Sequence, residues 1–167
     1  YAEDLEGGWV LIEDFGDARM RDWLDENPAG EDEAYASAIE TLADLHRKPA
    51  GPFPPYDEET YLREAGLFTE WYCAALGLDV DSDGFEAAWR EALAPLMASQ
   101  QPGVTVLRDY HAENIMLLRP NAGAKEQGVI DFQDALVGHP AYDLVSLLQD
   151  ARRDVSRELE ARMLAHY

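Results

Sequence analysis

Three side chains with oxygen atoms lie beside short apolar runs in the last third of the chain. Asp109 and Asn114 bracket a polar loop between two such runs, and Asp131 follows Ile130 in a third. Loops at the ends of strands are where binding and catalytic residues concentrate. Carboxylate and amide oxygens suit Mg²⁺, which usually takes one or two protein carboxylates and completes its shell with water and substrate phosphates. The residues therefore predict an oxygen-rich, magnesium-type site at the mouth of a small sheet.

The elements that must position these residues are predicted from apolar spacing and turn residues. In 32–46 the apolar residues recur at spacings of three and four, which indicates one buried helix face. The Pro- and Gly-rich stretch 49–55 cannot be helical. The predicted helices are 20–24, 32–46, 57–76, 83–100, 140–152 and 156–167, and the predicted strands are 3–5, 9–12, 104–107, 115–118 and 129–132, the first two joined at Gly7-Gly8. Helices, a small strand cluster and further helices indicate an α+β fold in which helices dominate.

The two helices that follow the linker are expected to bury aromatic residues. Asp83 and Glu86 have capping-box spacing at the start of the second. Cys73 lies in an apolar stretch and is expected to be buried as packing. The residues expected to face inward are Leu62, Ala65, Phe68, Trp71 or Tyr72, and Ala75 in the first helix, and Phe85, Trp89, Leu93 and Leu96 in the second.

Length and composition indicate a folded domain. The chain has 167 residues, of which 47% are hydrophobic and 10% aromatic, enough for one domain with a core. No stretch approaches the roughly 20 apolar residues of a membrane span, and no secretory signal is visible. A single cysteine excludes an internal disulfide and a cysteine-based metal site, which fits a reducing cytoplasm. Because the chain opens with Tyr1 instead of Met, we expect it to be part of something longer.

The charge is strongly acidic. Thirteen Lys and Arg residues against 34 Asp and Glu residues give 13 − 34 = −21. Nucleic acid is disfavoured as a partner because binding it requires phosphate-neutralising cations, and an anionic membrane surface is disfavoured for the same reason. Two interpretations stay open: attraction of a cationic substrate and a solubilising acidic surface. The even spread of the acidic residues favours the second.

The two polar loops resemble those of a known family. The aminoglycoside phosphotransferase and choline kinase family, a branch of the protein-kinase-like fold, has the pattern H-G-D-x-H-x-x-N-I followed by I-D-[FW]. The matching positions are Asp109, His111, Asn114, Ile115, Ile130, Asp131 and Phe132. Three further segments resemble the family. Residues 138–144 resemble its G-x-P-x-Y-D-L helix start, residues 42–46 its helix ending in L-H, and residues 13–17 the hinge between its lobes. The resemblance covers essentially the whole chain, although Arg108 stands where the family has Gly.

The resemblance implies a fold and a division of the chain. Residues 18–167 would form the mostly helical C-terminal catalytic lobe, incomplete at its C-terminal end, with a small β cluster that carries the catalytic loops. Residues 1–17 would be the last hairpin of an otherwise absent N-terminal lobe and the hinge. Lys48 and Lys125 are the only lysines, and both lie in polar loops. We therefore expect the isolated fragment to lack the family's phosphate-binding lysine and to turn over ATP poorly.

Roles for individual residues follow from the same resemblance. Asp109 would be the catalytic base, Asn114 and Asp131 would hold Mg²⁺, and ATP would be the co-substrate. The supporting residues are Glu13, Asp14 and Phe15 at the nucleotide hinge, and His111 and Asp143 as braces of the catalytic loop, although Asp143 also fits a first-turn helix carboxylate. Gln133 and Asp134 either contact substrate or cap a turn.

The narrower resemblance is to bacterial anomeric kinases, through the stretches 107–114, 131–135 and 150–155. These enzymes phosphorylate N-acetylmuramate and N-acetylglucosamine at C1 during cell-wall recycling. The alternatives are a kinase of aminoglycosides or other amines such as choline, and a non-catalytic scaffold that has kept the fold. The oligomeric state is left open by the sequence.

Overall fold

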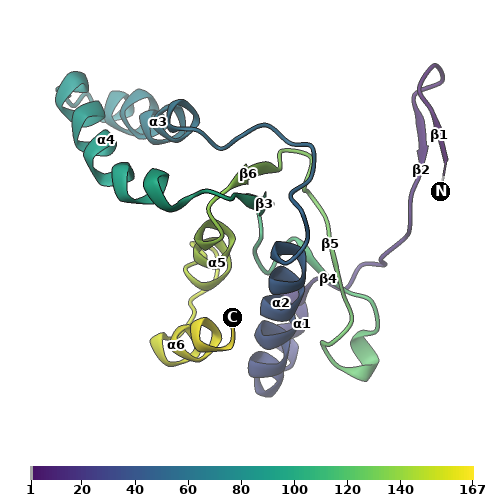
Figure 1. Ribbon diagram of the computed structural model, residues 1–167. Helices are drawn as coiled ribbons and strands as arrows, with labels where there is room; N and C mark the ends of the chain where they lie inside the picture. The colour runs from purple at the N-terminus through teal and green to yellow at the C-terminus, as the bar shows by residue number, and fades with distance from the viewer. Residues whose placement is uncertain (1) are drawn as a thin grey trace.

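The computed structural model describes residues 2–167 and has the predicted α+β fold (Figure 1). Six α-helices and six three-residue strands lie within these residues. The helices are α1 Met20–Glu26, α2 Glu31–His46, α3 Glu58–Leu67, α4 Ser82–Ser99, α5 Ala141–Leu148 and α6 Arg157–His166. The strands are β1 Ala2–Asp4, β2 Trp9–Leu11, β3 Val104–Val106, β4 Ile115–Leu117, β5 Gln127–Val129 and β6 Leu136–Gly138.

The strands form three antiparallel pairs: β1 with β2, β3 with β6, and β4 with β5. The sequence did not predict β6, because three residues are too few for an alternating pattern to stand out. The strand predicted over 129–132 is wrong in its bounds, since β5 spans Gln127–Val129 and shares only Val129 with the prediction. Asp131 has φ 62°, in the left-handed region, and this conformation cannot continue an extended strand.

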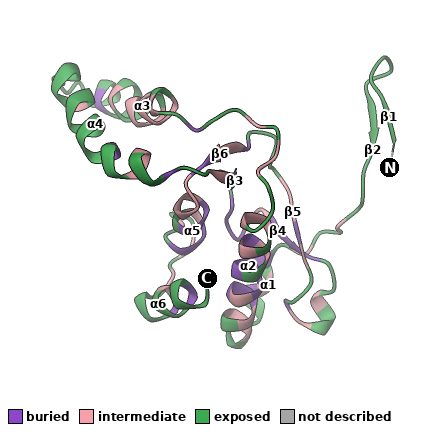
Figure 2. Ribbon diagram, viewed as in Figure 1, coloured by how far each residue is buried: buried purple, intermediate pink, exposed green. Residues whose placement is uncertain are grey.

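The main core forms around α2, as its apolar face predicts. Tyr35, Ala38, Ile39 and Leu42 are fully buried there. They belong to one cluster with buried residues of α1, β4, α5 and α6. Figure 2 shows these buried positions gathered where α1, α2 and β4 lie together. A rigid body of this kind can hold the loops that enter and leave β4 and β5.

The hairpin of β1 and β2 lies apart from this core. Every residue of both strands is exposed, including Trp9, Val10 and Leu11 (Figure 2). A two-stranded hairpin is marginally stable by itself in water. Among residues 2–167, no helix combines the length and the hydropathy that a membrane span requires.

The segment predicted as a single helix over 57–76 is interrupted. α3 ends at Leu67, and the π-helical segment Phe68–Cys73 follows it. The predicted capping box at the next helix is also wrong, because the Asp81 side chain caps α4 by accepting a hydrogen bond from the Gly84 amide at 2.9 Å.

The inward face predicted for these helices is only partly right. Cys73 and Leu93 are buried, whereas Phe68, Trp71 and Tyr72 are more than half exposed. The helices α3 and α4 pack on each other as a hairpin that projects from the body (Figure 1), so most of their surface meets solvent. The aromatic rings instead stack on one another. The centroid of the Phe68 ring lies 5.2 Å from that of Tyr72 and 6.4 Å from that of Phe85.

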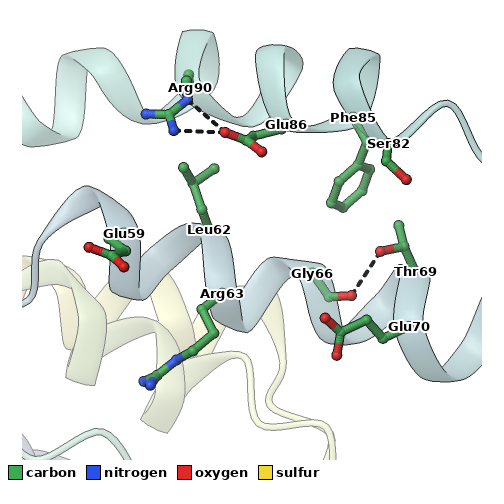
Figure 3. A pocket seen from close by; sticks show the side chains of 10 residues that line it. All are labelled: Glu59, Leu62, Arg63, Gly66, Thr69, Glu70, Ser82, Phe85, Glu86 and Arg90. Atoms are coloured by element: carbon green, nitrogen blue, oxygen red, sulfur yellow. Dashed lines mark hydrogen bonds and ion pairs between the residues drawn. The ribbon is translucent and has the colours of Figure 1, made fainter.

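A pocket of about 430 Å³ lies between α3 and α4, with Leu62 and Phe85 directed into the gap (Figure 3). Its rim carries charges of both signs. Arg90 of α4 binds Glu86 one turn earlier and Glu58 at the start of α3. These ion pairs hold the two helices of the hairpin to each other.

His46, the last residue of α2, links that helix to the end of the chain. Its Nδ1 lies 2.7 Å from the Tyr167 hydroxyl oxygen. Burial lowers the pKa of His46 from 6.5 to about 4, so the folded protein keeps this ring neutral at pH 7. The charged His46 that a helix C-terminus would favour is therefore absent.

We expect His46 to contribute to acid lability. Because the unfolded chain binds a proton here near pH 6.5 and the folded chain only near pH 4, stability is lost as the pH falls through this window. His46→Gln should reduce the difference in unfolding free energy between pH 7 and pH 4.5 by about 1–2 kcal/mol, after allowance for the partial exposure of the ring. Urea unfolding at both pH values measures it.

The matched control is His166→Gln at the exposed end of α6, where the imidazole lies 3.1 Å from Glu40. If both variants reduced the difference in unfolding free energy between pH 7 and pH 4.5 equally, the burial of His46 would not be the cause of that difference.

Candidate functional site

The two polar loops meet because of the β4–β5 register. Ile115 pairs with Val129 in an antiparallel ladder, so the loop that enters β4 and the loop that leaves β5 emerge at the same end. The Ile130 amide continues this pairing and donates to the Asn114 carbonyl at 3.1 Å. Asn114 and Ile130, which are 16 positions apart in the chain (130 − 114), are thereby placed side by side.

The Asn114 side chain joins three of the predicted site residues. Its Nδ2 donates to the Asp109 carbonyl at 3.1 Å and lies 3.5 Å from Asp131 Oδ2. The His111 ring nitrogen Nε2 is 3.4 Å from Asn114 Nδ2. Asp109 itself is exposed, so its carboxylate is accessible to a substrate. The structure therefore brings Asp109, Asn114 and Asp131 to one place.

The Asp131 carboxylate is held by a residue two positions further along the chain. Gln133 Nε2 donates to Asp131 Oδ1 at 2.6 Å. A non-glycine residue in the left-handed region is costly, although Asp and Asn tolerate it better than most. Such conformations cluster at functional sites. Asp134, the other candidate substrate contact, is exposed, and its carbonyl lies 3.5 Å from Arg108 Nη1.

Asp143 braces the start of the first loop from below. Its Oδ2 accepts from the Leu107 amide at 2.7 Å, and its Oδ1 accepts from the Arg108 amide at 2.9 Å. Burial raises the pKa of this carboxyl to about 6, although the two amide donors act in the opposite direction. The group is thus ionised at pH 7 and buried completely. This geometry matches a loop brace, not an exposed helix-end carboxylate.

The predicted hinge lines a pocket beside Asp131. Glu13, Asp14 and Phe15 contribute to an open cavity of about 620 Å³ whose other side is formed by β4, β5 and residues 130–132. Asp14 Oδ1 accepts from the Gly16 amide at 2.8 Å, which fixes the turn after Phe15. The Phe15 ring packs so closely on β5 that a Cβ at Gly128 would lie 2.5 Å from it.

Comparison with known proteins identifies the family. The model of the phosphotransferase enzyme family matches residues 1–167. The chain belongs to this family. Because the match spans the whole chain, every loop described above falls within the phosphotransferase domain.

Relatives of this phosphotransferase chain are named N-acetylmuramate/N-acetylglucosamine kinase. The one from Caulobacter vibrioides is 38% identical over 180 residues, covering 99% of this chain and 48% of the relative. The one from Pseudomonas aeruginosa is 39% identical over 154 residues, covering 90% and 43%. The chain therefore spans about half the length of the relatives it matches.

A solved structure shares the fold. The ADP-bound crystal structure of the aminoglycoside phosphotransferase APH(2'')-Ib superposes with a TM-score of 0.61 at 18% identity. The match covers 96% of this chain and 54% of that one. At this identity the likeness concerns the fold alone.

The donor set of the phosphotransferase chain fits magnesium. Within residues 2–167 no group of three or more His, Cys, Asp or Glu side chains is placed to hold a metal. Asp131 offers one carboxylate, and the Asn114 amide has an oxygen, Oδ1, besides the Nδ2 that faces both Asp109 and Asp131. Magnesium usually takes one or two protein carboxylates and completes its shell with water and substrate phosphates, so this set of oxygen atoms is compatible with it. Zinc would favour nitrogen and sulfur ligands instead.

Two contributors to the site were missed by sequence reasoning. Arg19 lines the hinge pocket, and Gly128 lets Phe15 approach β5. A glycine inside an apolar strand often marks a close approach of this kind, so the position of Gly128 could have been predicted from the sequence. No pattern in the sequence predicts that Arg19 lines the pocket.

Replacement of Asp143 should loosen the catalytic loop. Asp143→Asn retains one acceptor and turns an amide group toward the second N–H donor, so a buried bond is lost. We expect a loss of about 1–3 kcal/mol in unfolding free energy and faster amide hydrogen exchange at Leu107 and Arg108. Asp22→Asn is the matched control, because Asp22 also lies in the first turn of a helix but is exposed. Equal losses of unfolding free energy in the two variants would show that Asp143 acts only as a carboxylate at a helix N-terminus and not as a brace of the loop.

Proposed function

We propose that this chain is the catalytic part of an ATP-dependent kinase that phosphorylates a hydroxyl of a small molecule. The observation that carries the proposal is the Asn114 amide, which links the Asp109 carbonyl to the Asp131 carboxylate. Phosphoryl transfer requires positioning and charge stabilisation more than covalent chemistry from the protein. Membership of the phosphotransferase family supports this assignment.

In this proposal the chain comprises the C-terminal lobe of a protein-kinase-like fold and a small part of its N-terminal lobe. Residues 18–167 are the C-terminal lobe, and residues 1–17 are the last hairpin of the N-terminal lobe with the hinge. The exposure of Trp9, Val10 and Leu11 in β2 supports this division, because other elements of an N-terminal lobe would pack on this apolar strand. The hinge pocket lined by Glu13, Asp14 and Phe15 is the proposed nucleotide site.

The residues have separate tasks. Asp109 is the base that orients the acceptor hydroxyl and takes its proton. Asn114 and Asp131 are the protein ligands of Mg²⁺, which supplies positive charge against the nucleotide phosphates. His111 and Asp143 hold the loop that carries Asp109, and Gln133 orients the Asp131 carboxylate. Asp134 remains the candidate substrate contact.

We propose an N-acetylated amino sugar, N-acetylmuramate or N-acetylglucosamine, as the acceptor, phosphorylated at its anomeric hydroxyl. The support is the name shared by four relatives that are 35–39% identical. The test is a screen of the full-length protein for ATP consumption with both sugars, with their 1-O-methyl glycosides as controls. Turnover of the free sugars and not of the glycosides is expected. Equal turnover of the glycosides would exclude the anomeric position.

A second candidate acceptor is an aminoglycoside or another amine, favoured by the net charge of −21. A cationic substrate would be attracted by the acidic surface, and its KM would rise steeply with salt. The screen should therefore include aminoglycosides and choline at low and high salt. The absence of turnover with every acceptor would favour a non-catalytic scaffold.

A further inference from the structure

Arg108, directly before Asp109, has a backbone conformation that favours glycine. Its φ is 74°, and a side chain in the left-handed region costs about 1–2 kcal/mol. The family pattern has glycine at this position. A glycine would adopt this conformation without that cost.

The Arg108 side chain is anchored on three sides. Its Nη2 forms an ion pair with Glu64 Oε1 at 2.5 Å, and its Nη1 lies 3.5 Å from the Asp134 carbonyl. The guanidinium carbon sits 5.9 Å from the centroid of the Tyr56 ring, within the range of a cation–π contact. Glu64 accepts a second hydrogen bond, on Oε2, from the Tyr56 hydroxyl. Burial raises the pKa of Tyr56 well above its usual value, so that hydroxyl remains a donor.

The Arg108–Glu64 pair is more sheltered than an ordinary surface pair. The two side chains are 25% and 23% exposed, and Tyr56 beneath them is fully buried. Partly buried charges are screened much less by salt than exposed ones. The pair can thus hold the Arg108 side chain in a defined position against Glu64.

The pair also joins two parts of the molecule. Glu64 belongs to α3, and the α3–α4 hairpin projects from the body (Figure 1). The other ion pairs of the hairpin are those of Arg90 with Glu86 (Figure 3) and with Glu58, and both lie within the hairpin. Over residues 2–167, the Arg108–Glu64 pair is the one ion pair that connects the hairpin to the loops of the site. Tyr61 of α3 adds to this connection by stacking on Tyr56 at 3.8 Å.

The backbone of Arg108 is held from a different direction. Asp143 accepts from its amide, and the Ser146 hydroxyl donates to its carbonyl at 3.3 Å. Both residues lie on α5. One residue therefore ties α3, through its side chain, to α5, through its backbone, immediately before the proposed base.

We propose that Arg108 is a positioning residue that couples the α3–α4 hairpin to Asp109 through Glu64 and Tyr56. This inference rests on the proposed function, because it assigns to Asp109 the role of base. A displacement of α3 moves the anchor of the residue before Asp109, so the orientation of the base depends on the position of the hairpin. The side-chain contacts of Arg108 described above are all with protein groups, so the proposed role acts through Asp109.

The test is a double-mutant cycle in the full-length protein. Arg108→Gly suits the backbone conformation and should fold, and Glu64→Gln keeps an acceptor for the Tyr56 hydroxyl. Each variant should lower kcat by about tenfold while KM for ATP stays within about twofold. The double variant should also lose about tenfold, since one interaction is removed in all three. Arg90→Ala, which breaks ion pairs inside the hairpin, is the matched control and should leave kcat unchanged.

Losses that multiply in the double variant, or a kcat like that of the wild type in Arg108→Gly, would overturn the coupling. Amide hydrogen exchange gives a second readout that needs no substrate. Glu64→Gln should speed exchange at Leu107 and Arg108 by about tenfold, and unchanged exchange there would also contradict the inference. If the wild type phosphorylates no acceptor, the proposed function fails, whereas the exchange result still decides whether the hairpin and the loop are coupled.

Discussion

Asp109→Asn should lower kcat by about 10²–10⁴, the contribution typical of a positioned base. The amide of asparagine has nearly the same shape as the carboxylate but cannot take the proton of the acceptor hydroxyl. The Asn114 amide donates to the backbone carbonyl of residue 109, so that contact should survive the substitution. KM for ATP should therefore stay within about twofold. Steady-state kinetics of the full-length protein, with whichever acceptor it phosphorylates in the screen, measures both constants.

The control for this variant is Asp44→Asn, which removes one carboxylate from the exposed face of α2, where Asp44 pairs with Arg47. It should have the activity of the wild type. A rate for Asp109→Asn within a few-fold of the wild type would show that another group takes the proton, and the assignment of the base would be wrong.

The helical part of the fold could be predicted because local patterns specify it. Tyr35, Ala38, Ile39 and Leu42 recur at helical spacing, and all four are buried on one face of α2. The same reasoning failed for Phe68 and Trp71. Their spacing indicates a helix face, but a pattern does not say whether a partner element covers that face. The hairpin formed by α3 and α4 leaves these rings to solvent.

The candidate site could be predicted from two loops because the chain places them next to paired strands. Asn114 precedes β4 and Asp131 follows β5, and the antiparallel register brings both to one end. No local pattern could reveal Glu64 or Tyr56 as neighbours of Arg108, since they lie more than 40 residues away and belong to another helix and a linker. The bracing role of Asp143 was similarly open in the sequence, and its burial distinguishes a brace from a helix-end charge.

Replacement of Asp131 should have the second large effect, and it should depend on magnesium. Asp131→Asn keeps a residue that tolerates φ 62° and an oxygen that can bind a metal, but it removes the one formal charge of the proposed ligand pair Asn114 and Asp131. We expect kcat at ordinary magnesium concentrations to fall by about 10²–10³, because charge stabilisation of the transferring phosphoryl group depends on the bound cation. Raising the magnesium concentration should restore part of the rate, whereas it should not help Asp109→Asn.

Two further variants separate ligation from positioning at the same site. Gln133→Ala removes the hydrogen bond that orients Asp131 but leaves the carboxylate, so it should cost about tenfold and raise the magnesium requirement only modestly. Asn114→Asp retains an oxygen ligand but loses the amide donor to the Asp109 carbonyl. It should therefore bind magnesium and still be slow, because the proposed base is no longer held beside the metal. Magnesium titrations of initial rate, with isothermal titration of the Mg–nucleotide complex, distinguish these outcomes. If all three variants showed the same magnesium dependence as the wild type, Asn114 and Asp131 would not be the ligands, and the oxygen-rich end of β4 and β5 would not be the site of phosphoryl transfer.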